Sequence, residues 1–77
     1  MSYYARGRYD EAAAAYEKAL AVNPRLAESH NYLGLTRYAQ GKYGQAQIHF
    51  NQALALGYKV DPRVLESTAG MLKQEGN

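Results

Sequence analysis

The 77-residue chain lacks cysteine altogether, and it contains no tryptophan, one phenylalanine and two prolines. Without cysteine, neither a disulfide framework nor a thiolate-bound metal can stabilise so short a chain. A chain of this length buries only about 60% of the surface that its unfolded form exposes. Tight helix packing or a second copy of the chain must therefore supply the hydrophobic core.

Long apolar segments and runs of one charge are also missing. No segment approaches the ~20 apolar residues of a membrane span, and the first residues turn polar before the apolar stretch of a signal peptide can form. We therefore expect a cytoplasmic protein that does not enter a membrane, with an exported compartment left open. Nine Lys and Arg residues against seven Asp and Glu form no cluster, so nucleic acid is not favoured as a partner.

The apolar residues that are present are mostly alanine and tyrosine. Eight tyrosines outnumber the single phenylalanine, so most aromatic rings can fill space between helices while they keep a hydroxyl near water. Small alanine side chains let helices approach closely. Both preferences suit a thin, two-layer stack of helices better than a thick globular core.

The sequence repeats itself with a spacing of 34 residues. When residues 1–24 are laid over residues 35–58, eight positions are identical. A period between about 20 and 50 residues indicates stacked repeats, in which each unit buries its apolar face against a neighbour. The identical pairs are Tyr4/Tyr38, Ala5/Ala39, Gly7/Gly41, Tyr9/Tyr43, Ala12/Ala46, Ala19/Ala53, Leu20/Leu54 and Ala21/Ala55.

Helix signals are strong along the chain, and strand signals are weak. Apolar residues recur at steps of three and four, which is the period of one face of a helix. The pattern predicts four helices, over residues 9–22, 25–40, 43–56 and 62 to about 74.

Turn-forming residues mark the ends of these helices. Gly41 and Gly57 follow the second and third helices, where glycine commonly ends a helix. Asp61 and Pro62 together predict the start of the last helix, with a capping side chain followed by a first-turn proline. Gly34 lies in mid-helix, where it costs about 1 kcal/mol relative to alanine. We therefore expect a close helix crossing at Gly34.

Residues 27–58 are similar to the tetratricopeptide repeat, a helix–turn–helix unit of this length. His30 and Arg37 stand where that pattern usually has aromatic residues, and Tyr58 stands where proline is common. The matching positions are Leu33-Gly34, Gly41-Lys42-Tyr43, Ala46, Phe50 and Ala53-Leu54.

The resemblance implies one all-α domain over residues 1–77, a helix–turn–helix repeat stack (an α-solenoid) of about four helices. Residues 1–24 would form a partial repeat, residues 25–58 a complete repeat, and residues 59–77 the leading helix of a further repeat. The match of residues 59–77 requires one inserted residue in the connection before the last helix. Of the first unit's leading helix, we expect only residues 2–5 to remain.

Such a stack would present unfinished packing faces at both ends. Three arrangements fit: a fragment of a longer stack, a small protein with a frayed start, and a homo-oligomer or domain swap. Our hypothesis is that chains associate, with the last helix of one chain beside the first helix of another. The expected self-association face consists of Tyr9, Ala12, Tyr16, Leu65 and Leu72.

No motif in the sequence indicates catalysis, a cofactor or a metal. His30 and His49 lack the spacing of metal ligands, and His30 is better explained as a packing residue. The serines and threonines lack a nucleophile motif, and the glycines form no phosphate-binding loop. We therefore predict that the chain is not an enzyme and binds no cofactor or metal.

The resemblance implies a concave surface lined by leading helices, where a partner peptide binds. Asn31 would pair with a backbone amide of the partner, and Leu35 with Tyr38 would hold an apolar side chain. The predicted function is a non-catalytic protein–protein interaction module, a scaffold or adaptor. A basic helical repeat that binds nucleic acid and a purely structural oligomerisation unit are the alternatives. The groove positions are Tyr4, Glu28, Asn31, Leu35, Tyr38, Arg63 and Glu66.

Overall fold

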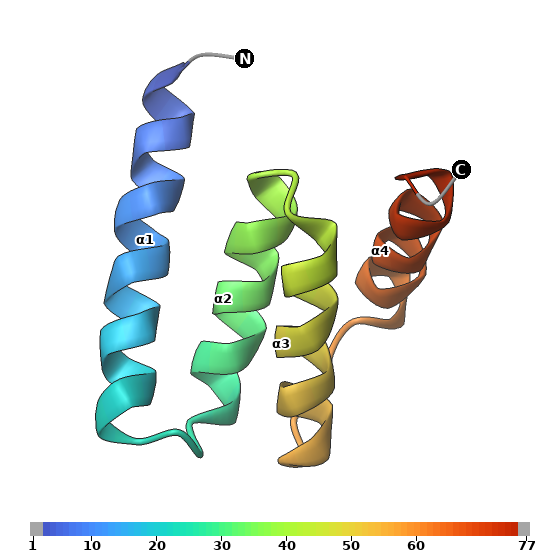
Figure 1. Ribbon diagram of the computed structural model, residues 1–77. Helices are drawn as coiled ribbons and strands as arrows, with labels where there is room; N and C mark the ends of the chain where they lie inside the picture. The colour runs from blue at the N-terminus through green and yellow to red at the C-terminus, as the bar shows by residue number, and fades with distance from the viewer. Residues whose placement is uncertain (1–2, 76–77) are drawn as a thin grey trace.

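The computed structural model describes residues 3–75, and the side chains of residues 8–74. Four helices lie side by side in alternating directions (Figure 1). The part of the chain from residue 3 to residue 75 contains no β-strand. The expected all-α stack is therefore confirmed. The helices are α1 (Tyr3–Val22), α2 (Ala27–Ala39), α3 (Tyr43–Ala55) and α4 (Pro62–Glu75).

The Cα atoms extend over 36 × 29 × 18 Å. The shortest of these dimensions corresponds to two layers of helices, because one helix with its side chains is about 10–12 Å across. None of the helices between residues 3 and 75 combines the length and the apolar character that crossing a membrane requires.

Glycines end α2 and α3 in the same way. Gly41 and Gly57 adopt positive φ values of 81° and 92°, a conformation that costs glycine little. After α2, the Lys42 amide donates a hydrogen bond to the Arg37 carbonyl oxygen at 2.8 Å. After α3, the Tyr58 amide donates to the Ala53 carbonyl oxygen at 3.0 Å. Both ends thus satisfy carbonyl groups that a helix would otherwise leave free.

Asp61 caps α4 as the sequence predicts. Its Oδ1 atom accepts a hydrogen bond from the backbone amide of Arg63 at 2.9 Å, while Pro62 occupies the first helical position. A related turn follows α1, where Oδ1 of Asn23 accepts a hydrogen bond from the Arg25 amide at 3.1 Å.

α1 is longer than the sequence predicts. We expected it to begin near Tyr9, with Gly7 matching the turn glycine Gly41, but it runs from Tyr3 through Gly7 without a break. Starting a separate helix of a few residues is unfavourable, whereas extending an existing helix adds one hydrogen bond for each residue fixed. The first residues of the described chain therefore prolong α1, and they do not form a short leading helix.

The centre of the fold is the crossing of α2 and α3 at Gly34. A Cβ atom at this position would lie 2.6 Å from Cε1 of Phe50 and 3.2 Å from the Ala46 carbonyl oxygen. Only a residue without a side chain allows this approach. The close crossing predicted from the mid-helix glycine is therefore confirmed.

The helices on either side pack against this central hairpin. α1 is held to α2 by the stacked rings of Tyr16 and Tyr32, whose centroids are 5.8 Å apart, and by the buried Ala13. An ion pair also joins Glu17 to Arg37, at 2.5 Å. α4 packs on a buried cluster of α3 and the following loop, which consists of Ala46, Phe50, Ala53 and Val60.

Candidate functional site: a pocket between α2 and α4

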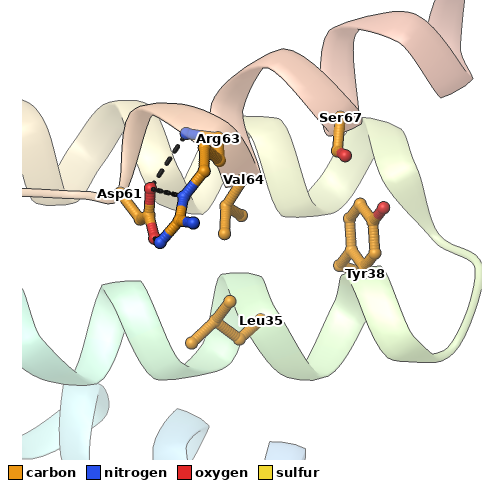
Figure 2. Close-up of a pocket in the computed structure, with 6 residues that line it drawn as sticks. All are labelled: Leu35, Tyr38, Asp61, Arg63, Val64 and Ser67. Atoms are coloured by element: carbon orange, nitrogen blue, oxygen red, sulfur yellow. Dashed lines mark hydrogen bonds and ion pairs between the residues drawn. The ribbon is translucent and has the colours of Figure 1, made fainter.

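An open pocket of about 400 Å³ lies between α2 and the beginning of α4. Figure 2 shows the side chains of the two helices facing each other across it. α2 contributes two residues, and α4 with its capping residue contributes four. The lining residues are Leu35, Tyr38, Asp61, Arg63, Val64 and Ser67.

The α2 side of the pocket is an apolar wall. Leu35 and Tyr38 are one helical turn apart, so their side chains project from the same side of α2. The ring of Tyr38 meets the ring of Tyr43 edge to face, with centroids 5.2 Å apart and an angle of 76°. Tyr38 also packs against the buried cluster under α4. Its orientation is therefore fixed by packing, while Leu35 is exposed.

The α4 side combines an apolar residue with a charged rim. Val64 packs against the same buried cluster. Asp61 accepts hydrogen bonds from the backbone and the side chain of Arg63, and these two bonds, in that order, lower the pKa of the Asp61 carboxyl. The Arg63 side chain is almost fully exposed. The rim therefore carries one charge of each sign, and its guanidinium group can reach a ligand.

These groups suit ligand binding better than catalysis. A ligand pocket usually has apolar walls and a few polar groups that set orientation. Among the six lining residues, Ser67 provides a hydroxyl, but Asp61 is occupied by Arg63 and no histidine is present to activate a nucleophile. Within the described residues, no group of three or more His, Cys, Asp or Glu side chains is placed to hold a metal ion.

Two family models match the chain. The model described as TPR repeat matches residues 2–41, more than half of the 77-residue sequence, and the model described as Tetratricopeptide repeat matches residues 27–59. The chain belongs to the tetratricopeptide repeat (TPR) family. A search of curated proteins and a search of solved structures each found no match. TPR units generally mediate protein–protein interactions, and the family typically forms non-catalytic scaffolds.

The pocket brings together three of the groove residues predicted for this TPR chain: Leu35, Tyr38 and Arg63. Glu28 lies outside the pocket, accepts a hydrogen bond from the Tyr32 hydroxyl at 3.3 Å, and raises the pKa of that hydroxyl by its negative charge. Asn31 is only 8% exposed and does not line the pocket.

Two further groove positions lie away from the pocket or outside the described side chains. Glu66 is exposed on α4, but it is not among the lining residues. Tyr4 belongs to α1, and its side chain lies outside the described residues.

Sequence reasoning missed Asp61, Val64 and Ser67. It carried the same helical stripe from α2 to α4, although a pocket between two helices is lined by different sides of each. Asp61 had been recognised only as a helix cap. The sequence did contain one usable signal, the start of α4 at Pro62. Counted from that start, Val64 and Ser67 fall on the side of α4 that faces the preceding repeat.

The residues predicted for self-association fall into two groups. Tyr9, Ala12 and Tyr16 are half-buried on α1. Leu65 packs partly against the buried cluster of its own chain, and Leu72 lies toward Gly44 of α3, 3.9 Å from the place of a Cβ atom there. The α4 residues are therefore partly used within the chain.

The two histidines form a contact that the sequence did not indicate. Nε2 of His30 donates a hydrogen bond to the Pro24 carbonyl oxygen at 2.9 Å, and its ring stacks on that of His49 with centroids 5.9 Å apart. The Nδ1 atoms of both rings are buried and make no hydrogen bond within the described chain. Burial, followed by the charges of His30 and Arg37, lowers the pKa of His49. The neutral form of the His49 ring is therefore favoured in the folded chain.

Proposed function

We propose that this TPR chain is a non-catalytic adaptor that holds an apolar side chain of a partner peptide in the pocket between α2 and α4. The observation that carries the proposal is the pocket itself, with Leu35, Tyr38 and Val64 as its apolar surface and Asp61 with Arg63 at its rim. Its volume of about 400 Å³ is near the lower end of typical ligand sites, which favours one or two side chains over a large cofactor.

The pocket also requires little ordering of its groups before it can bind. Tyr38 and Val64 are held by packing against the buried cluster, so their rotamer freedom is already lost in the free chain. Binding to fixed groups costs less conformational entropy than binding to mobile ones. The charged pair at the rim can meanwhile contact the backbone or a polar side chain of the peptide.

The experiment is a selection of binding peptides from a random displayed library against the full chain, followed by titration of the selected peptides. Leu35→Asp should weaken their binding about tenfold or more, since a buried apolar anchor is worth at least about 1.4 kcal/mol. Ile48→Asp is the matched control, because Ile48 is also an exposed apolar helix residue but lies on α3 outside the pocket.

Circular dichroism would show that both variants keep the helical fold. Equal loss with Leu35→Asp and Ile48→Asp, or no loss with either, would contradict the pocket as the binding site. The same chain titrated with single-stranded RNA provides a further arm. Binding that weakens steeply with salt would favour the nucleic-acid alternative, because phosphate contacts release counterions.

A second candidate function is self-association, favoured by residues of α1 that are only half-buried. In the described chain this helix packs mainly against α2, where the Tyr16 ring stacks on that of Tyr32. We propose that a second copy covers the parts of Tyr9, Ala12 and Tyr16 that stay exposed.

A further inference from the structure

Corresponding residues of α1 and α3 differ in burial. Ala46, Phe50 and Ala53 of α3 are 0% exposed, because α2 and α4 cover the helix from two sides. Their counterparts in α1, at a spacing of 34 residues, are Ala12, Tyr16 and Ala19, and all three are only half-buried. Within residues 3–75 no helix covers α1 as α2 covers α3, and the internal repeat indicates which kind of helix face would fit there.

The contacts between α2 and α3 define the face that does the covering. His30 stacks on His49, Gly34 meets Phe50, and Tyr38 meets Tyr43. The three α2 residues are spaced by four, so they form one stripe along the helix.

α4 carries the same stripe without a covering helix in the described chain. Thr68 and Leu33 are both 1% exposed, which indicates that α4 corresponds to α2 at a spacing of 35 residues. At this spacing His30, Gly34 and Tyr38 correspond to Leu65, Ala69 and Lys73. Leu65 is half-buried, and Ala69 and Lys73 are exposed.

We infer that α4 of one chain covers α1 of a second copy in the way that α2 covers α3. The central residues of the α2 and α4 stripes, Gly34 and Ala69, are both small. Each therefore lets its helix approach the helix that it covers. The Lys73 stem would lie along an aromatic ring, an arrangement that lysine favours because its ammonium group stays in water. The pairs placed together are Leu65 with Ala15, Ala69 with Tyr16, and Lys73 with Tyr9 of the second copy.

The contact is head to tail, because it joins two different surfaces. It rests on the self-association part of the proposed function and is independent of peptide binding between α2 and α4. The two helices in this contact cannot approach as closely as α2 and α3 do at Gly34. A Cβ atom there would lie 2.6 Å from the Phe50 ring, and Ala69 has such an atom, so the Tyr16 ring of the second copy must lie farther out. We therefore expect a reversible association that depends on concentration.

Two exposed alanines allow each surface to be blocked separately. Ala15→Glu places a charge on α1 in the proposed contact, and Ala69→Glu places one on α4. Ala14→Glu is the matched control, because Ala14 is exposed on α1 and corresponds to Ile48, which is 57% exposed on α3. Mass in solution is measured by sedimentation, from micromolar to millimolar concentrations of each chain.

The unmodified chain and the Ala14→Glu variant should rise in mass above 8.6 kDa as concentration increases, whereas each blocked variant alone should stay at that mass. An equal mixture of the two blocked variants should form a one-to-one dimer, since one keeps a free α4 and the other a free α1. An Ala69→Glu variant that still dimerises alone would overturn α4 as the partner surface. Self-association through α1 would then remain the explanation of the dimer. An unmodified chain that keeps its single-chain mass throughout would overturn self-association itself. Neither result would bear on peptide binding, which the Leu35→Asp titration measures.

Discussion

Replacing Gly34 with alanine tests the closest contact of the fold. Two opposite effects meet at this position. Alanine is the better helix residue by about 1 kcal/mol, so α2 alone would gain stability. The new methyl group, however, would lie 2.6 Å and 2.7 Å from two atoms of the Phe50 ring and 3.2 Å from the Ala46 carbonyl oxygen.

The steric effect should exceed the gain in helix propensity. Phe50 is 0% exposed and packed between α2 and α4, so its ring has no solvent-filled space to enter. Forcing an extra methyl group into a packed core typically costs about 1–3 kcal/mol. The net expectation for Gly34→Ala is a loss of up to about 2 kcal/mol in the free energy of unfolding. In a domain of this size, each kcal/mol lowers Tm by about 4–8 °C.

Gly70 supplies a matched control within the same chain. It also lies inside a helix, but a Cβ atom there would meet nothing within 4 Å. Gly70→Ala should therefore raise the free energy of unfolding, by about 0.5–1 kcal/mol. Urea denaturation followed by circular dichroism measures both variants. If Gly34→Ala were as stabilising as Gly70→Ala, α2 and α3 would not cross at the observed distance, and the packing argument would be wrong.

Three further predictions follow from buried or paired polar groups. The pKa of His49 is lowered in the folded chain, mainly by burial, so the unfolded chain binds more protons and stability should decrease as pH falls below about 6.5. Urea midpoints across this range should show the decrease, and His49→Gln should reduce it. Glu17→Gln should cost about 0.5–1 kcal/mol, and less in high salt, because Arg37 is 13% exposed but Glu17 is 54% exposed; an equal cost at low and high salt would contradict an electrostatic role. Thr68→Val should change the free energy of unfolding by less than about 0.5 kcal/mol, since the lost hydrogen bond to the Val64 carbonyl is local. Thr68→Ala should cost about 1–2 kcal/mol, because it leaves a cavity. The same denaturation assay measures both variants.

The helical stack could be predicted from the sequence because its signals are local and repeat. Gly41 and Gly57 end helices through backbone conformations that depend on a few neighbouring residues. Gly34 indicates a close helix crossing by itself, because glycine inside a helix is otherwise unfavourable. α1 departed from the expectation because extending a helix through Gly7 adds hydrogen bonds that a turn at this position would lose.

The candidate site could be predicted only on its α2 side. Leu35 and Tyr38 follow from the groove positions that the resemblance implies for the leading helix of one repeat. Val64 and Ser67 depend on how α4 rotates about its axis after a connection with one extra residue, and no local pattern encodes that rotation. The stacked rings of His30 and His49 were missed for the same reason, since contacts between helices depend on their relative position along both axes.

Corresponding aromatic positions of the repeat also differ in burial. α3 has Phe50 where α1 has Tyr16. Phenylalanine has no group that needs water, and Phe50 is 0% exposed. Tyr16 is half-buried and stacked on Tyr32, so its ring gains apolar contact while its hydroxyl can remain hydrated. Because solenoid stability is a sum of repeat and interface contributions, a side chain suited to both water and contact lets α1 stay folded in the described chain and still accept a second chain.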